Sequence, residues 1–307
     1  MIKFNSLVGQ KRVKELILHS LIACKKQKRL FPNCLLSGWP GLGKTSLAHA
    51  IAGELDVDFA EVHGGNIEKV KQILPILVRQ LKRPNSILFI DEVHSLPKQV
   101  QEFLYPAMIT HEVRTAYGKL EVPPFTVIGA TTNTGLLARP FYDRFVMHLN
   151  LDEYSDDELI EITNFHAGRI GVKLGQDVAI NIARRAKQTP RLIVNYLELI
   201  RDYIVSEDMN VVSIESANRV FDLNGIDEQG LTLQDHKYLD FLRTNSPSGL
   251  KTISANLQLE EETIRHMEVY LLKQGLIMIS PQGRQYIITK QELTDLQDEI
   301  DDMLSKV

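Results

Sequence analysis

Residues 38–45 read Gly38-Trp39-Pro40-Gly41-Leu42-Gly43-Lys44-Thr45 and match the spacing G-x-x-x-x-G-K-T at every fixed position. A short apolar run over 34–36 precedes this stretch, and a helical pattern over 46–55 follows it. Strand, glycine loop and helix in this order form the setting that a phosphate-binding loop requires. The glycines let successive backbone N–H groups and the helix N-terminus face one anion, so the stretch predicts a phosphate site on an α/β fold.

The lysine and threonine that close the loop extend this prediction to a nucleoside triphosphate. We expect Lys44 to reach the β- and γ-phosphates and Thr45 to ligate Mg²⁺. The alternative is a glycine turn that merely caps a helix, but the spacing and the strand–loop–helix order favour the nucleotide site. The residues that the stretch places at the nucleotide are Gly38, Gly41, Leu42, Gly43, Lys44, Thr45 and Ser46.

The composition sets limits on the class of protein. The chain has 307 residues, 44% of them hydrophobic, which predicts two or three domains. Its net charge of −4 argues against a basic coat for nucleic acid, although residues 1–30 carry eight Lys or Arg against one acid, so a basic patch is possible. The sequence shows neither a signal-peptide pattern nor an apolar run that could cross a bilayer, so we expect a cytoplasmic protein without a membrane partner.

Two acids follow a second apolar run. Residues 86–92 read Ser-Ile-Leu-Phe-Ile-Asp-Glu, the pattern of a central parallel strand whose carboxyl end carries acids to the phosphate site. We expect Asp91 to hold Mg²⁺ through water and Glu92 to orient or deprotonate the attacking water. Adjacent carboxylates are common by chance, and only the upstream phosphate loop makes this motif specific. His94 fits a packing or switching role better than a catalytic one.

Polar residues also follow a third apolar run, at 125–130. Thr132 is expected to sense the γ-phosphate through the attacking water, although a Thr or Asn cap on the next turn is the alternative. Further along, Arg144 has no obvious partner in its own site. In a ring of like subunits it would reach the neighbour's γ-phosphate and offset transition-state charge, whereas a lone arginine is usually a surface residue.

The pattern of the third unit, residues 231–290, predicts a winged helix. Residues 250–257 and 260–274 are expected to form two helices, and two short strands are expected around the turn Pro281-Gln282-Gly283. This unit carries seven basic against six acidic residues, so contacts to a DNA backbone would be few. Arg265 and Arg284 are the contacts we predict, and a winged helix that binds protein is the alternative.

These motifs, together with those at 104–108, 123–132 and 188–191, resemble the RuvB family of AAA+ ATPases, bacterial motors that drive branch migration of Holliday junctions. The resemblance runs from about residue 8 to 286, with the motifs in the family's order. It implies an AAA+ nucleotide-binding α/β domain with a parallel sheet over 1–150, a helical lid over 151–226 and a winged-helix DNA-binding domain over 227–290. An acidic amphipathic helix is expected over 291–307, to bind a partner or cap the domain.

The resemblance also implies roles for single residues. Thr132 takes the first sensor position, Arg144 is the trans-acting arginine finger, and Arg191 contacts the nucleotide from the lid as the second sensor. Val8 and Gly9 fall where the family's N-terminal segment lies against the adenine. From its sequence context alone, Arg191 could equally form a salt bridge at a helix start, because it follows Pro190.

As a whole, the resemblance implies an ATP-dependent motor, with Mg²⁺, that moves branched or duplex DNA as a homo-oligomeric ring of six copies. A clamp- or helicase-loader-like switch, which remodels a protein partner on DNA without translocating, is the alternative function.

The chain departs from the family pattern at four places. Trp39 replaces a proline of the loop, Tyr142 replaces an arginine beside the finger, and Gln282 replaces an arginine of the wing. The segment over 109–122 is shorter than the hairpin with which the family docks on the adaptor RuvA, which leaves a RuvA-like partner open.

Overall fold

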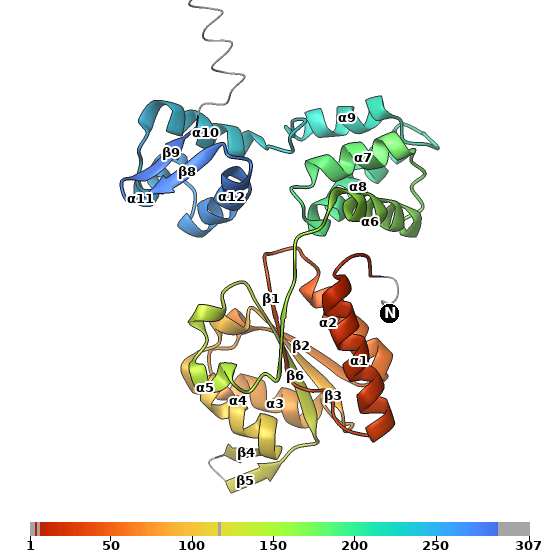
Figure 1. The fold of residues 1–307 in the computed structure, drawn as a ribbon, viewed down its shortest axis with the longest axis vertical. Coiled ribbons are helices and arrows are strands. Elements are labelled where there is room, and N and C mark those ends of the chain that lie inside the picture. The colour runs from red at the N-terminus through yellow and green to blue at the C-terminus, as the bar shows by residue number, and fades with distance from the viewer. Residues whose placement is uncertain (1–3, 5–6, 116–117, 288–307) are drawn as a thin grey trace, which may run out of the picture. The chain divides into compact units, whose positions relative to one another are not determined.

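The computed structural model describes residues 4, 7–115 and 118–287 of the chain (Figure 1). The chain divides into two compact units, residues 1–202 and 203–307. The acidic helix predicted over 291–307 lies outside the described residues. Over the described ranges, no helix has the length and apolar character needed to span a bilayer.

A parallel five-stranded sheet forms the centre of the first unit. Its order is β2 (Phe59–His63), β3 (Ser86–Asp91), β6 (Phe125–Thr131), β1 (Cys34–Ser37) and β7 (Met147–Asn150). The strand predicted at 125–130 is β6, and each of its residues is buried, as expected for a central strand covered on both faces. β7 was not predicted, because its four residues form a partly exposed edge strand without a continuous apolar run.

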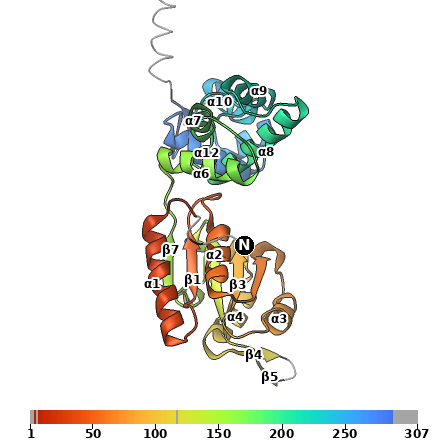
Figure 2. The same ribbon diagram turned by 90° about the vertical axis from the view of Figure 1, so that its right-hand side faces the viewer.

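Helices cover both faces of the sheet. In Figure 1, α1 (Lys11–Gln27) and α2 (Lys44–Leu55) lie on one side, and α3 (Val70–Arg79) and α4 (Lys98–Thr110) on the other. A two-stranded hairpin, β4 (Glu112–Thr115) and β5 (Gly118–Glu121), follows α4 at the lower end of the view in Figure 2. The short helix α5 (Arg139–Tyr142) precedes β7.

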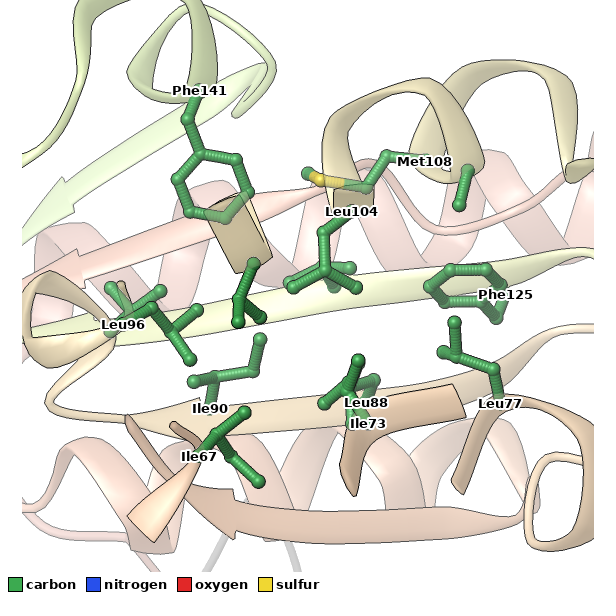
Figure 3. Close-up of a cluster of buried hydrophobic side chains, with 14 of the residues drawn as sticks. Ile67, Ile73, Leu77, Leu88, Ile90, Leu96, Leu104, Met108, Phe125 and Phe141 are labelled. Atoms are coloured by element: carbon green, nitrogen blue, oxygen red, sulfur yellow. The ribbon is translucent and has the colours of Figure 1, made fainter. Parts of the chain in front are cut away.

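The largest core lies between the sheet and the α3–α4 side (Figure 3). Leu88, Ile90 and Phe125 extend from the strands, and Leu77 and Leu104 meet them from the helices. All five side chains are at most 2% exposed. Burial of an aliphatic or aromatic side chain of this kind stabilises a fold by about 1.5 to 3 kcal/mol, so this layer fixes the positions of the strand ends.

Three helices continue the first unit after the sheet. They are α6 (Asp156–Arg169), α7 (Gln176–Arg185) and α8 (Pro190–Ser206), which runs into the second unit. Ser155 caps α6 in a capping box with Glu158, as its sequence pattern predicts. The lid predicted over 151–226 covers these helices and α9 (Ile214–Leu223) of the second unit.

The rest of the second unit is a winged helix. It contains α10 (Leu233–Asn245), α11 (Leu250–Leu257) and α12 (Glu261–Lys273), followed by the antiparallel strands β8 (Ile277–Ser280) and β9 (Gly283–Tyr286). The two predicted helices and the hairpin are confirmed. The sequence analysis missed α10, although Thr232 and Asp235 form a capping box at its start.

Gly64 provides a test of how tightly the end of β3 is packed. A Cβ atom at Gly64 would lie 2.3 Å from the backbone oxygen of Glu92, so at least one of the two residues must move in Gly64→Ala. We expect this variant to lose about 1 to 3 kcal/mol of stability in denaturant unfolding. Gly168→Ala is the control, because no atom lies within 4 Å of its Cβ position in α6. Equal unfolding midpoints for the two variants would contradict this packing.

Candidate nucleotide-binding site

The ends of three neighbouring strands define the site. In the parallel register Ser37 of β1 lies beside Thr131 of β6, and Ile90 of β3 lies beside Gly129. The backbone N–H of Gly38 donates a hydrogen bond to the Thr131 carbonyl oxygen at 3.3 Å. The predicted phosphate loop, the predicted sensor and the predicted acids therefore leave the sheet at one edge, where α/β proteins bind ligands.

The loop adopts a backbone that requires its glycines. Gly38, Gly41 and Gly43 have φ values of 142°, 83° and 92°, all in the region that other residues rarely adopt. A Cβ atom at Gly41 would lie 3.2 Å from the Cβ of Arg191 and 3.3 Å from that of Thr189. The loop is thus closely packed against the residues that begin α8.

Lys44 is buried at the centre of this loop, with 6% of the residue exposed. Its Nζ donates hydrogen bonds to the carbonyl oxygens of Gly38 at 2.7 Å and Trp39 at 2.9 Å. No described carboxylate forms an ion pair with it. Burial lowers the pKa of Lys44, and the nearby carboxylates of Glu92 and Asp91 oppose that effect without cancelling it. A buried ammonium group that lacks an acidic partner is suited to an anionic ligand.

The two acids at the end of β3, Asp91 and Glu92, have separate surroundings. An Asp91 carboxylate oxygen accepts a hydrogen bond from the backbone N–H of Glu92 at 3.0 Å. Glu92 has left-handed backbone angles, φ 46° and ψ 51°, which turn the chain away from the strand. Its Oε2 accepts a hydrogen bond from the Thr132 hydroxyl at 3.2 Å. The predicted catalytic glutamate and the predicted sensor are therefore direct neighbours.

His94 belongs to the same hydrogen-bonded group. Its Nδ1 lies 3.1 Å from Glu92 Oε2 and 2.9 Å from the Thr131 hydroxyl oxygen. Thr131 Oγ1 also accepts a hydrogen bond from the backbone N–H of Asn133. The sequence analysis left His94 outside the catalytic set, and the structure gives it contacts that orient Glu92. Its spacing three residues after Asp91 was the only available signal.

The predicted base-binding segment lines a pocket next to the loop. Val8 lies in its wall with Leu42, Ser46 and Tyr154. A Cβ atom at Gly9 would lie 2.6 Å from the Tyr154 ring, so only glycine fits there. The Tyr154 hydroxyl donates a hydrogen bond to the Leu42 carbonyl oxygen at 2.9 Å, and burial raises the pKa of this phenol. Tyr154 was not predicted, because it precedes α6 without any motif of its own.

The two predicted arginines lie in different places. Arg191 is exposed, and its charge contributes to the lowered pKa of Lys44. Arg144 instead lies with its guanidinium carbon 5.3 Å from the centre of the Tyr105 ring, on α4. Arg144 thus contacts a helix of its own subunit, whereas Lys44, Glu92, Thr132 and Arg191 lie near one another.

In the winged helix the two predicted DNA contacts differ. Arg265 is well exposed, with its side chain 62% accessible and Glu261 at 3.9 Å. Arg284 donates hydrogen bonds to both carboxylate oxygens of Glu268, at 2.8 and 3.3 Å, and this pairing raises its pKa. Tyr238 donates to the same carboxylate. Arg284 therefore anchors the wing to α12, and this placement argues against its predicted contact with DNA.

Comparison with known families covers nearly the whole chain. The family model described as the Holliday junction DNA helicase RuvB P-loop domain matches residues 2–151. The models of the RuvB AAA lid domain and the RuvB C-terminal winged helix domain match residues 154–227 and 228–296. The chain belongs to the RuvB family.

Individual RuvB proteins agree with this membership over most of their length. The chain is 36% identical over 304 residues to the Holliday junction branch migration complex subunit RuvB of Orientia tsutsugamushi, covering 95% of this chain and 92% of that protein. The RuvB subunit of Campylobacter hominis is also 36% identical, over 292 residues that cover 92% of this chain and 85% of the relative. The solved Thermotoga maritima RuvB Holliday junction branch migration motor superimposes with a TM-score of 0.84 at 32% identity, covering 97% of each chain.

The RuvB-type site of this chain binds a nucleotide, and its donor set fits a nucleoside triphosphate with Mg²⁺. The buried Lys44 ammonium group and the glycine loop provide the donors that phosphate needs. Mg²⁺ usually keeps several waters and takes only one or two ligands from the protein besides the phosphates. The Thr45 hydroxyl and the Asp91 carboxylate are the two oxygen groups that would serve.

Two variants separate binding from hydrolysis. We expect Lys44→Ala to weaken ATP binding by more than about tenfold, because it removes the buried cation. Glu92→Gln should retain ATP affinity but hydrolyse ATP at least about 100-fold more slowly, because an amide cannot accept the proton of water. Trp39, the single tryptophan of the chain, is exposed in the loop, so we expect its fluorescence to change when a nucleotide binds. Normal turnover by Glu92→Gln would remove this residue from the catalytic role.

Proposed function

We propose that this chain is an ATP-dependent DNA motor that drives branch migration of Holliday junctions in recombination and repair. The single observation that carries the proposal is the site at the ends of β1, β3 and β6, in which the Glu92 carboxylate accepts a hydrogen bond from Thr132 and lies near the buried Lys44. Family membership over all three domains supports the DNA substrate. A motor that acts on junctions in chromosomal DNA would be located in the cytoplasm.

In this proposal ATP and Mg²⁺ supply the chemistry of phosphoryl transfer, and the protein positions the reacting groups. The loop and Lys44 bind the phosphates, and Asp91 and Thr45 hold the metal. Glu92 accepts the proton of the attacking water, while Thr132 and His94 orient its carboxylate. Val8 lines the pocket for the base, Gly9 packs against the Tyr154 ring that also lines it, and Arg191 approaches the phosphates from α8.

The proposal places the active form in a ring of six copies. Arg144 lies outside its own nucleotide site, and no described acid pairs with it, in contrast to Arg83 with Asp58 and Arg139 with Asp143. A half-buried guanidinium without a counter-ion supports a role as an arginine finger toward the γ-phosphate of the next subunit.

DNA binding is assigned to the winged helix, with Arg265 of α12 as the predicted backbone contact. The hairpin of β4 and β5 remains the predicted surface for a RuvA-like adaptor. Each of its two strands has only four residues, so an adaptor would have a short surface to bind. A clamp- or helicase-loader-like switch is the alternative, and membership of the RuvB family does not favour it.

A synthetic four-way junction tests the proposed activity, run beside a linear duplex of equal length and strand composition. We expect the chain with ATP and Mg²⁺ to dissociate the junction into two duplexes and to leave the linear duplex intact. Glu92→Gln is the control, because it should bind ATP and junction without separating the strands.

A negative result in the junction assay counts against the motor only if the chain hydrolyses ATP under the same conditions. If the wild-type chain hydrolyses ATP at saturating concentration but leaves the junction intact both alone and with an added RuvA-type adaptor, the motor proposal fails and the loader-like switch is favoured. A junction that stays intact only in the assay without the adaptor leaves a missing adaptor as the other explanation. The Arg265→Ala variant, measured beside Lys273→Ala at the end of the same helix, tests whether DNA affinity depends on the predicted contact.

A further inference from the structure

The backbone of Arg144 is fixed by a hydrogen bond and by buried neighbours, whereas its guanidinium group forms no ion pair with a described residue. Its N–H donates a hydrogen bond to the Phe141 carbonyl oxygen at 3.1 Å. Phe141 and Phe145, on either side of it, are 1% and 2% exposed and pack edge to face at 5.3 Å. Its Nε is buried and finds no hydrogen-bond acceptor among the described residues. The chain thus fixes the backbone of Arg144 and leaves the buried Nε of its guanidinium group without a hydrogen-bond acceptor among the described residues.

The remaining contact of this side chain is aromatic. Tyr105 of α4 is half-buried against the main core, and its ring centre lies 5.3 Å from the guanidinium carbon. A ring face attracts a cation at this distance and leaves the outer nitrogens of a guanidinium free to donate. An acidic partner would instead occupy those donors and compete with a phosphate.

The helix that carries Tyr105 also fixes the segment that leads to Arg144. Gln101, one turn earlier on α4, is 5% exposed. Its amide nitrogen donates to the Leu96 carbonyl oxygen at 2.8 Å, and its amide oxygen accepts a hydrogen bond from the Ala138 N–H at 3.3 Å. Ala138 precedes α5 and Leu96 follows the turn that begins at Glu92, so α4 bridges the two ends.

We propose that Tyr105 is a positioning residue for the arginine finger: its ring holds the Arg144 guanidinium in an orientation that leaves the terminal nitrogens available for the neighbouring subunit's γ-phosphate. The inference rests on the proposed trans role of Arg144. Hydrolysis should therefore depend on the aromatic ring at position 105 and be independent of the hydroxyl group, for which no described residue provides a hydrogen bond.

The test compares Tyr105→Phe, which keeps the ring, with Tyr105→Leu, which keeps a buried apolar side chain and removes the ring. Single-turnover ATP hydrolysis is measured with assembled, DNA-bound full-length protein, and ATP affinity is measured by Trp39 fluorescence. We expect Tyr105→Phe to hydrolyse at the wild-type rate. Tyr105→Leu should be about three- to tenfold slower, the range that a cation–π contact of moderate strength implies, with ATP affinity unchanged.

A double-mutant cycle with Arg144→Ala separates positioning from a general packing defect. If Tyr105 acts through Arg144, Tyr105→Leu causes no further loss when Arg144 is already alanine. An equal loss in both backgrounds, or full activity of Tyr105→Leu, overturns the inference while leaving the finger intact. Full activity of Arg144→Ala itself overturns the proposed finger, and with it the role of Tyr105.

Discussion

The buried ammonium group of Lys44 is the interaction on which the site depends. Its hydrogen-bond partners are the loop carbonyl oxygens of Gly38 and Trp39, which are dipoles, and the nearby Glu92 and Asp91 carboxylates offset its charge only in part. Burial of an ion without a paired counter-ion is costly, and the lowered pKa of Lys44 expresses that cost. A bound phosphate would add negative charge beside Lys44, so the burial that destabilises its ammonium group strengthens nucleotide binding.

The parallel register makes this arrangement possible. β1, β6 and β3 are neighbours, and their hydrogen bonding brings the loop after Ser37 level with Thr131 and close to Asp91. The Glu92 carboxylate then meets Thr132 and His94, so its orientation depends on two strands at once. The position of Arg144 depends on other contacts. The core holds its backbone, the Tyr105 ring lies against its guanidinium, and no carboxylate of the described residues forms an ion pair with it, which is the basis for the proposal that copies of the chain share the hydrolytic site.

Much of this could be predicted from the sequence where the signal is local. The glycine loop, the buried run that ends at Asp91 and the capping box at Ser155 are each set by residues within one turn or one strand. Contacts between distant segments could not be predicted. The placement of Arg284 against Glu268 depends on how the wing folds onto α12, and a basic residue in a wing gives no sign of that internal partner. β7 and the ring of Tyr105 over Arg144 were missed for the same reason: their roles arise from neighbours far away in the chain.

Subunit mixing tests the divided site most directly. The Glu92→Gln variant keeps Arg144 but lacks the proposed catalytic carboxylate. The Arg144→Ala variant keeps Glu92 but lacks the proposed arginine finger. At some interfaces of a mixed ring, Glu92 of one copy would face Arg144 of the next. The account predicts that the mixture hydrolyses ATP faster than either variant alone at equal total concentration. A mixture whose rate is only the average of the two variants would contradict a site shared between subunits.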